Sequence, residues 1–186
     1  MNIVVQTHND FTVVRPDITW ERYNRDFYVP DFIKGLLWVP VAYAPVIRPG
    51  KFIQTQFAGR YIAPTAYGVL FYADDAFSSP EAFAQACCLN HSSLLPEPYP
   101  EYSVSGAADV FSFEINDAQV FRADLDADPF IKAALASASR RVLLRNGDIM
   151  ALELAAPAPL EGTGPFHFTG KFSLAENPLL DFNVII

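Results

Sequence analysis

Two neighbouring acidic residues, Asp74 and Asp75, follow the apolar run GVLFYA, and Glu81 lies just beyond them. Carboxylate oxygens are the ligands that hard divalent cations prefer, so these acids could belong to a metal site if a further oxygen ligand converged on them. The alternative is a solvated strand end, because acidic side chains are exposed in most proteins. The sequence favours the solvated strand end.

Cys87 and His91 are four residues apart, the spacing that places two side chains on one face of a helix. A thiolate and an imidazole together can act as a nucleophile and its base, or as half of a soft metal site. The alternative is a buried cysteine at a helix end beside a surface histidine, and the sequence favours it because unpaired cysteines are mostly buried and inert. His8 and His167 have no neighbours that suggest a metal site.

The composition indicates which kinds of protein this chain could be. Its 186 residues are 51% hydrophobic and 18% charged, with a formal charge of −8, so we expect one folded domain over residues 1–186. The negative charge disfavours binding to nucleic acid or to anionic membranes. The first residues lack the pattern of a secretory signal, and no apolar run could span a bilayer. The only cysteines, Cys87 and Cys88, are adjacent, so we expect no disulfide and a cytoplasmic location.

Short runs rich in Val, Ile, Phe and Tyr alternate with Pro and Gly breaks, a pattern typical of strands. Fifteen prolines fit a protein with many loops and few long helices. The predicted strands are Ile3–Gln6, Phe11–Val14, Val41–Ile47, Tyr67–Ala73, Asp109–Ile115, Gln119–Arg122, Ile149–Leu154, Pro165–Phe172 and Leu179–Ile186.

Three helices are expected between these strands. The first would carry an apolar stripe of Ile53, Phe57 and Tyr61, which recur at i, i+4 and i+8. The second would begin at Ser79, which precedes a proline as a helix cap often does, and would continue through the run FAQACC. The third would be capped by Asp128 and would end at two arginines that complement the helix dipole.

The runs FYVPDF, RPGKFI, QFAGRY and GVLFYADD, taken in this order, resemble the fumarylacetoacetate hydrolase family, especially its short bacterial members. The resemblance needs no gap from Phe27 to Asp75, and the later segments FSFEIND, LLRNGDIM and LLDFNVI extend it over most of the chain. It implies a fold that is mainly β with a few short helices, a mixed β-sandwich or roll around a β-clip core.

The resemblance also implies a chemistry. Enzymes of the family cleave or rearrange C–C bonds of 2-oxo or 1,3-dicarbonyl acids, and they use Mg²⁺ or Mn²⁺ held by three carboxylates, two from a Glu-x-Glu pair and one from an aspartate. Such a cation acts as a Lewis acid on the enolising oxygens. The two glutamates, spaced i and i+2, lie on one side of a strand and can reach one ion. The family is typically dimeric.

This chain departs from the family where that chemistry would lie. The Glu-x-Glu positions align with Pro40 and Ala42, and the position of the metal-binding aspartate aligns with Leu70. Asp74 replaces an arginine of the family, and the family's catalytic lysine falls near Cys87. We therefore expect no metal cofactor. The side chains that remain for a residual site are Asp75, Cys87 and His91.

Three functions stay open at this point. The first is a metal-free, catalytically inactive relative of the family that acts in binding or assembly, as a homodimer or paired with an active relative. The second is a hydrolase, decarboxylase or isomerase that acts on a small oxo acid or 1,3-dicarbonyl acid through a relocated site. The third is a small-molecule binding module that uses the former active-site pocket, made more apolar by Pro40, Ala42 and Leu70.

Overall fold

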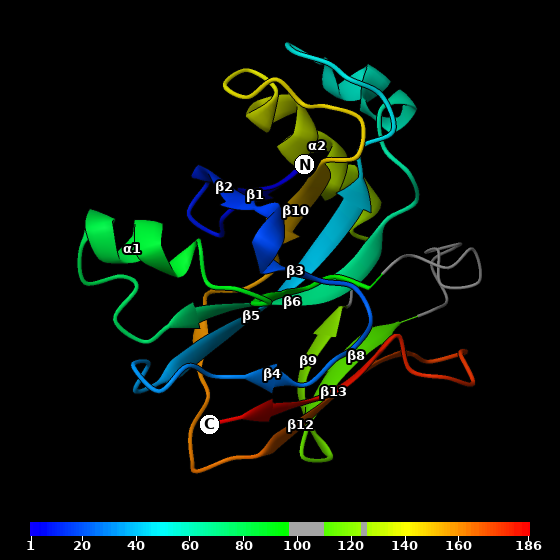
Figure 1. The fold of residues 1–186 in the computed structure, drawn as a ribbon. Helices are drawn as coiled ribbons and strands as arrows, with labels where there is room; N and C mark the ends of the chain where they lie inside the picture. Colours follow the sequence, from blue (N-terminus) through cyan, green and yellow to red (C-terminus); the bar gives the residue numbers. More distant parts are fainter. Residues whose placement is uncertain (97–109, 124–125) are drawn as a thin grey trace.

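The computed structural model describes residues 1–96, 110–123 and 126–186, and β-strands make up most of this part of the chain (Figure 1). The helices are two short α-helices and two 3-10 helices: η1 (Asp17–Thr19), η2 (Thr55–Arg60), α1 (Pro80–Ala86) and α2 (Asp128–Ala138). The strands are β1 (Asn2–Gln6), β2 (Thr12–Pro16), β3 (Trp20–Glu21), β4 (Phe27–Tyr28), β5 (Leu36–Pro45), β6 (Ala66–Ala73), β7 (Ser93–Leu94), β8 (Phe111–Ile115), β9 (Ala118–Ala123), β10 (Ile149–Glu153), β11 (Ala158–Pro159), β12 (Phe166–Phe172) and β13 (Leu180–Ile185).

These strands form two sheets. The large sheet has the order β2-β1-β10-β5-β6-β7-β3, with β11 also paired to β5. The small sheet has the order β4-β13-β12-β8-β9 and lies below the large sheet in Figure 1. Most neighbours are antiparallel, but β1 with β10, β3 with β7 and β13 with β4 are parallel. The expected fold class, mainly β with a few short helices, is confirmed.

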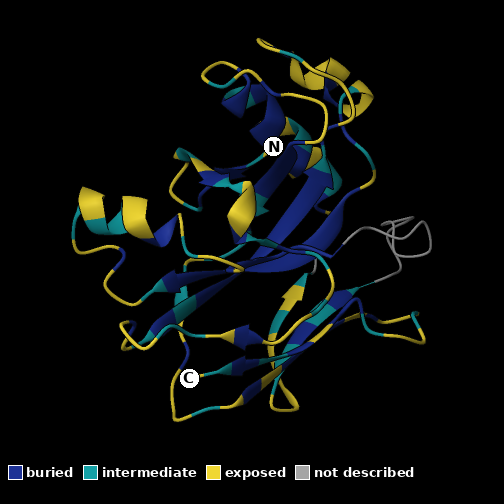
Figure 2. Ribbon diagram, viewed as in Figure 1, coloured by how far each residue is buried: buried dark blue, intermediate teal, exposed yellow. Residues whose placement is uncertain are grey.

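Both faces of the large sheet are covered, and this explains the nearly continuous apolar runs of β5 and β6 (Figure 2). We call the side toward the small sheet and α2 the sandwich face; its core includes Trp38, Ala42, Val69 and Phe71. We call the opposite side the α1 face; it carries the residues of β1, β5, β6 and β10 that alternate with the sandwich-face residues, and it packs against the end of α1. These residues are Ile3, Val5, Val39, Val41, Tyr43, Leu70, Tyr72, Ile149 and Ala151.

The predicted strands are all present, with shifted ends. The largest shift is in β5, which begins at Leu36 rather than Val41. Pro40 lies inside this strand; it has no N–H to donate, but its carbonyl accepts a hydrogen bond from the Leu154 N–H at 2.9 Å. The structure starts β8 at Phe111, and the expected first residue, Asp109, lies outside the described residues.

The predicted helices are corrected in three places. The stripe of Ile53, Phe57 and Tyr61 does not form an α-helix; the chain forms the shorter 3-10 helix η2 there, and the Phe52 and Ile53 N–H groups before it donate to Ser139, the residue that follows α2. Ser79 caps α1 as expected, but the helix ends at Ala86, before both cysteines. Ala127, not Asp128, is the N-cap of α2, and the two arginines lie beyond the end of that helix.

Candidate functional site

The strand register separates the three positions that the resemblance assigns to metal ligands. Leu70 of β6 is paired with Val39 of β5, so both side chains lie on the α1 face. Pro40 is paired with Val69 and Ala42 with Tyr67, and these pairs belong to the sandwich face. The expected space between Pro40, Ala42 and Leu70 does not exist, because the sheet itself lies between them. The sequence alignment could not detect this, since a shift of one residue moves every side chain of a strand to the other face.

The donor set of these strands does not fit a divalent cation in either register. Neither β5 (LLWVPVAYAP) nor β6 (AYGVLFYA) contains an acidic residue. Around Leu70 the α1 face is filled by buried apolar side chains such as Val39 and Val41. No group of three His, Cys, Asp or Glu side chains that could hold a metal occurs in the described residues.

A carboxylate does reach the α1 face, but from β10. Glu153 is paired with Val41, and only 2% of its side chain is exposed. Its Oε1 accepts a hydrogen bond from the Tyr72 hydroxyl at 2.7 Å, across the strand β5 that separates β10 from β6. Its Oε2 accepts from the His8 backbone N–H at 3.0 Å and lies 3.1 Å from His8 Nδ1. Glu153 is thus fully engaged by its own chain.

Arg15 of β2 is a second charged side chain within this face, and it is fully buried. Its Nη2 donates to the Phe71 carbonyl at 3.0 Å and to the Ser92 hydroxyl. Its guanidinium carbon lies 4.8 Å from the centre of the Tyr72 ring, a cation–π contact. We call Arg15, Tyr72, Glu153, His8 and Ser92 the buried polar network.

Burial raises the pKa of Tyr72 well above its usual range, although the positive charge of Arg15 acts in the opposite direction. The unfolded chain ionises this phenol near pH 10, whereas the native state resists ionisation. The stabilisation from the neutral phenol is therefore complete below pH 10 and is lost as the pH rises through the higher native pKa. Between pH 10 and 11 the free energy of unfolding should decrease less in Tyr72→Phe than in the unmodified protein, and we expect the difference to reach up to about 1.4 kcal/mol.

Urea denaturation at a series of pH values measures this slope. Tyr23→Phe is the matched control, because Tyr23 is 66% exposed and its removal should leave the slope as it is in the unmodified protein. Equal slopes for Tyr72→Phe and the unmodified protein above pH 10 would contradict the assignment.

The structure does not bring Cys87 and His91 together as a helical pair, because α1 ends before them. Cys87 is buried on the α1 face, and burial raises the pKa of its thiol, with the charge of Arg15 acting against that effect. His91 is exposed, has a φ of 55°, and places its Nδ1 3.4 Å from Glu21. This arrangement gives no support to a nucleophile pair, and it agrees with the favoured interpretation, a buried cysteine beside a surface histidine.

A cleft of about 710 Å³ lies where β6 ends. Asp74 and Asp75 line it, opposite the segment 30–34 and beside α1. Both acidic side chains are exposed, as the interpretation as a solvated strand end requires, but they share a cavity. Glu81 is not part of its wall. The complete lining is Pro30, Phe32, Ile33, Lys34, Ala73, Asp74, Asp75, Ala82, Gln85, Ala86, Cys88, Leu89 and Asn90.

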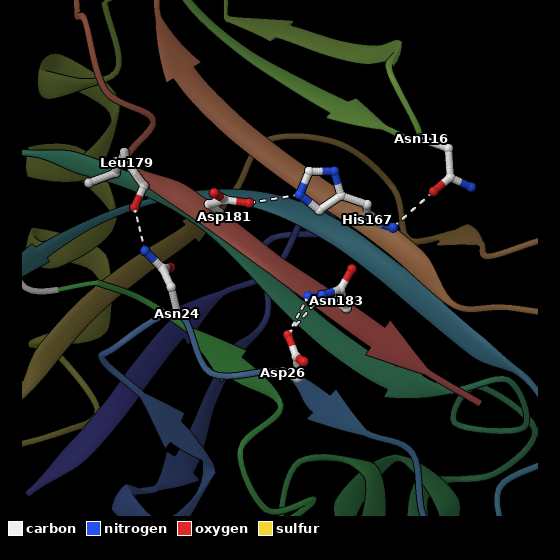
Figure 3. A network of polar contacts seen from close by, with 7 residues as sticks. All are labelled: Asn24, Asp26, Asn116, His167, Leu179, Asp181 and Asn183. Atoms are coloured by element: carbon white, nitrogen blue, oxygen red, sulfur yellow. Dashed lines mark hydrogen bonds and ion pairs between the residues drawn. The ribbon is translucent and has the colours of Figure 1, made fainter.

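A second polar network covers the outside of the small sheet (Figure 3). His167 Nε2 lies 2.7 Å from Asp181 Oδ1 of the neighbouring strand, and Asp26 Oδ1 accepts hydrogen bonds from the backbone and side-chain N–H groups of Asn183. His167 and Asp181 are both about half exposed. This network is a cross-strand ladder on a solvated face and encloses no cavity among the described residues, so it adds nothing to the site.

Sequence reasoning missed Arg15, Glu153 and the role of His8. The signal that could have found them is a charged residue inside an otherwise apolar strand, as in TVVRP and IMALE. A charge in such a run must be buried and paired when the strand is covered on both faces.

No family model matches this sequence, and no curated protein matches it. Solved structures do match over almost the whole chain. A fumarylpyruvate hydrolase from Pseudomonas aeruginosa, in complex with Mn²⁺ and pyruvate, is similar with a TM-score of 0.81 and 12% identity over 100% of this chain and 90% of that one. A protein assigned to the fumarylacetoacetate hydrolase family, from Yersinia pestis CO92, has a TM-score of 0.77 and 14% identity over 99% and 92%.

A third similar structure is 5-carboxymethyl-2-hydroxymuconate delta-isomerase from Mycobacterium smegmatis, with a TM-score of 0.74 and 14% identity over 99% of this chain and 78% of that one. The matched structures thus include a hydrolase and an isomerase, and they agree with the fold that the sequence motifs implied. The chain has the fold of the fumarylacetoacetate hydrolase family.

Proposed function

We propose that this chain is a metal-independent protein that binds a small polar molecule in the cleft at the end of β6 and does not catalyse C–C bond cleavage. The observation that carries the proposal is the cleft itself. Its volume of about 710 Å³ is in the range of small-molecule sites, which run from about 300 to 1,000 Å³. Its wall combines an apolar part with acidic, basic and amide groups, the mixture that fixes a polar ligand in one orientation.

The chemistry of β5 and β6 supports the metal-independent part. The matched hydrolase binds Mn²⁺, whereas in this chain both strands lack carboxylates and the carboxylate of Glu153 is engaged by Tyr72 and His8. Buried apolar residues at the former ligand positions stabilise a sheet that has no cation to neutralise buried acids.

The polar groups of the cleft support binding. The side chains of Lys34, Asp74 and Asp75 make no ion pair with any described residue, so their charges are free to meet a ligand. Gln85 and Asn90 add amide donors and acceptors, and Ile33 and Leu89 supply an apolar wall. The former pocket around Leu70 is packed, so a ligand the size of pyruvate has room beside α1 rather than beneath it.

In this proposal the protein works in the cytoplasm, as a homodimer or paired with a catalytically active relative, and has no contact with nucleic acid or membrane. The formal charge of −8, which repels phosphates, supports the expectation about nucleic acid. No helix in the described part of the chain is long and apolar enough to cross a bilayer.

The proposal can be tested by thermal unfolding and isothermal titration calorimetry. The probes are two carboxylates, pyruvate and oxaloacetate, and one diamine, putrescine. We expect at least one of these probes to raise the Tm saturably; a rise with putrescine, whose amines pair with the two acids, should disappear in the double variant Asp74→Asn and Asp75→Asn. Glu176→Gln, an exposed acid outside the cleft, is the control that keeps the response. Millimolar MgCl₂ or MnCl₂ should leave the Tm unchanged.

Two outcomes contradict the proposal. A saturable rise of several degrees with either metal salt would contradict metal independence. No saturable response to any probe, or the same response to putrescine in the double variant, would contradict binding in the cleft.

A second function is favoured by one feature of the same cleft. The cleft is lined by two carboxylates, Asp74 and Asp75, and by the exposed thiol of Cys88. A relocated hydrolase, decarboxylase or isomerase site for a small oxo acid or 1,3-dicarbonyl acid would need such reactive groups in one cavity. The hydrolase and isomerase among the matched structures agree with this alternative. Turnover of oxaloacetate or an acylpyruvate that is lost in Asp75→Ala would establish it, and no turnover across such substrates would exclude it.

A further inference from the structure

Arg15 is a buried cation whose contacts are all uncharged. Its guanidinium donates to a carbonyl and to a hydroxyl and lies against the Tyr72 ring. Its Nε and Nη1 have no hydrogen-bond partner among the described residues, although the side chain is fully buried. Buried charges in proteins are normally paired, and an unpaired buried donor calls for an unseen acceptor.

The carboxylate of the buried polar network does not supply that acceptor. Glu153 makes no ion pair with Arg15, and its two oxygens are taken by Tyr72 and His8. The thiol of Cys87 is also a poor candidate for the missing negative charge, since burial favours its neutral form. Arg15 therefore keeps its positive charge inside the α1 face, and three of its N–H bonds find no acceptor in the described part of the chain.

The cover over this face is thin. It is made by α1, which is seven residues long, and by the segment that follows it. The ring of Phe83 stacks on the ring of Tyr72, with 6.0 Å between their centres. Ala86 and Cys87 pack on the sheet. The other side of α1 is exposed, as Figure 2 shows. A helix held by so few buried side chains can open locally at small cost, which gives a solute a path to the network.

We infer that a small anion binds beside Arg15, beneath α1, and accepts hydrogen bonds from Nε or Nη1. The ligand is a monovalent anion of halide or formate size, because Arg15 is fully buried and carries a single uncompensated charge. A water molecule would accept from these donors but would leave the charge uncompensated. This site is separate from the cleft at the end of β6, so the inference does not depend on the proposed function.

Bromide is a suitable probe, because it can be located by its anomalous scattering. In crystals grown with sodium bromide we expect an anomalous peak within hydrogen-bond distance of Arg15 Nε or Nη1. In solution, bromide replacing gluconate at constant ionic strength should raise the Tm of the unmodified protein saturably, by about 3–5 °C at ten times the Kd. Gluconate is too large for the site and serves as the reference anion.

The rise should disappear in Arg15→Met and remain in Arg25→Met, where an exposed arginine is replaced. If Arg15→Met does not fold, the crystal and the titration of the unmodified protein decide. A water molecule or a side chain of this chain at Nε and Nη1, no anomalous peak there, or a peak without a saturable rise in Tm would each overturn the inference.

Discussion

Glu153→Ala is expected to lower the free energy of unfolding by about 3–5 kcal/mol, because it removes the shared acceptor of the buried polar network. The Tyr72 hydroxyl would lose its partner in a buried position, and the partly buried His8 backbone N–H would lose its acceptor. The substitution also removes the only carboxylate of the network that contains Arg15, so an already uncompensated charge becomes more costly.

Urea denaturation at pH 7 measures the change. Glu153→Gln is the matched variant: it keeps one oxygen as an acceptor for Tyr72, and we expect it to cost about 1–2 kcal/mol. Glu161→Ala, an exposed acid in a loop, should stay within about 0.5 kcal/mol of the unmodified protein. A loss of less than about 1 kcal/mol for Glu153→Ala would mean that the network contributes little to stability.

The fold could be predicted because its signals are local. Alternating or continuous apolar runs between prolines mark the strands, and the order of the motifs around FYVPDF and GVLFYADD indicates their arrangement. The Ser79 cap of α1 was predicted correctly for the same reason, since a side chain that bonds the Ala82 N–H is a short-range interaction.

The site could not be predicted, because it depends on contacts between distant segments. Tyr72 and Glu153 are 81 residues apart and meet only because β5 lies between β6 and β10. The register places Pro40 and Ala42 on the opposite face from Leu70, and no local pattern distinguishes the two faces when both are buried. The stripe from Ile53 to Tyr61 also depends on a distant contact, since the Ile53 N–H donates to the hydroxyl of Ser139, 86 residues away, and the segment forms a 3-10 helix.

The charges of this face are therefore arranged differently from those of a metal site. A cation held by acids from β5 and β6 would place negative charge at the centre of the sheet. Here the centre is apolar, and the charged groups, Arg15 on β2 and Glu153 on β10, come from the other half of the large sheet. Tyr72 connects them, since it contacts the guanidinium with its ring and the carboxylate with its hydroxyl. Such a network stabilises one conformation, and it needs no divalent cation to neutralise it.

Leu70→Asp restores the carboxylate that the fumarylacetoacetate hydrolase resemblance assigns to this position, and we expect it to lower the free energy of unfolding by about 3–5 kcal/mol. Leu70 is fully buried beside Val39, so the new carboxylate loses its hydration without gaining a partner. Manganese should not rescue the variant, because the neighbouring strand offers Val39 and Val41 on this face and a single carboxylate cannot hold the ion.

Urea denaturation with and without 1 mM MnCl₂ separates the cost of burying the carboxylate from any stabilisation by bound manganese. Leu70→Met conserves the volume and apolar character of the side chain and should cost less than about 1.5 kcal/mol, so a large loss in Leu70→Asp alone is due to the buried charge rather than to altered packing. If MnCl₂ restored most of the lost stability of Leu70→Asp, other oxygen ligands would have to converge on this face, and the metal-independent interpretation of the α1 face would be wrong. An equal loss with and without the salt means that the leucine at this position stabilises the sheet without a cation.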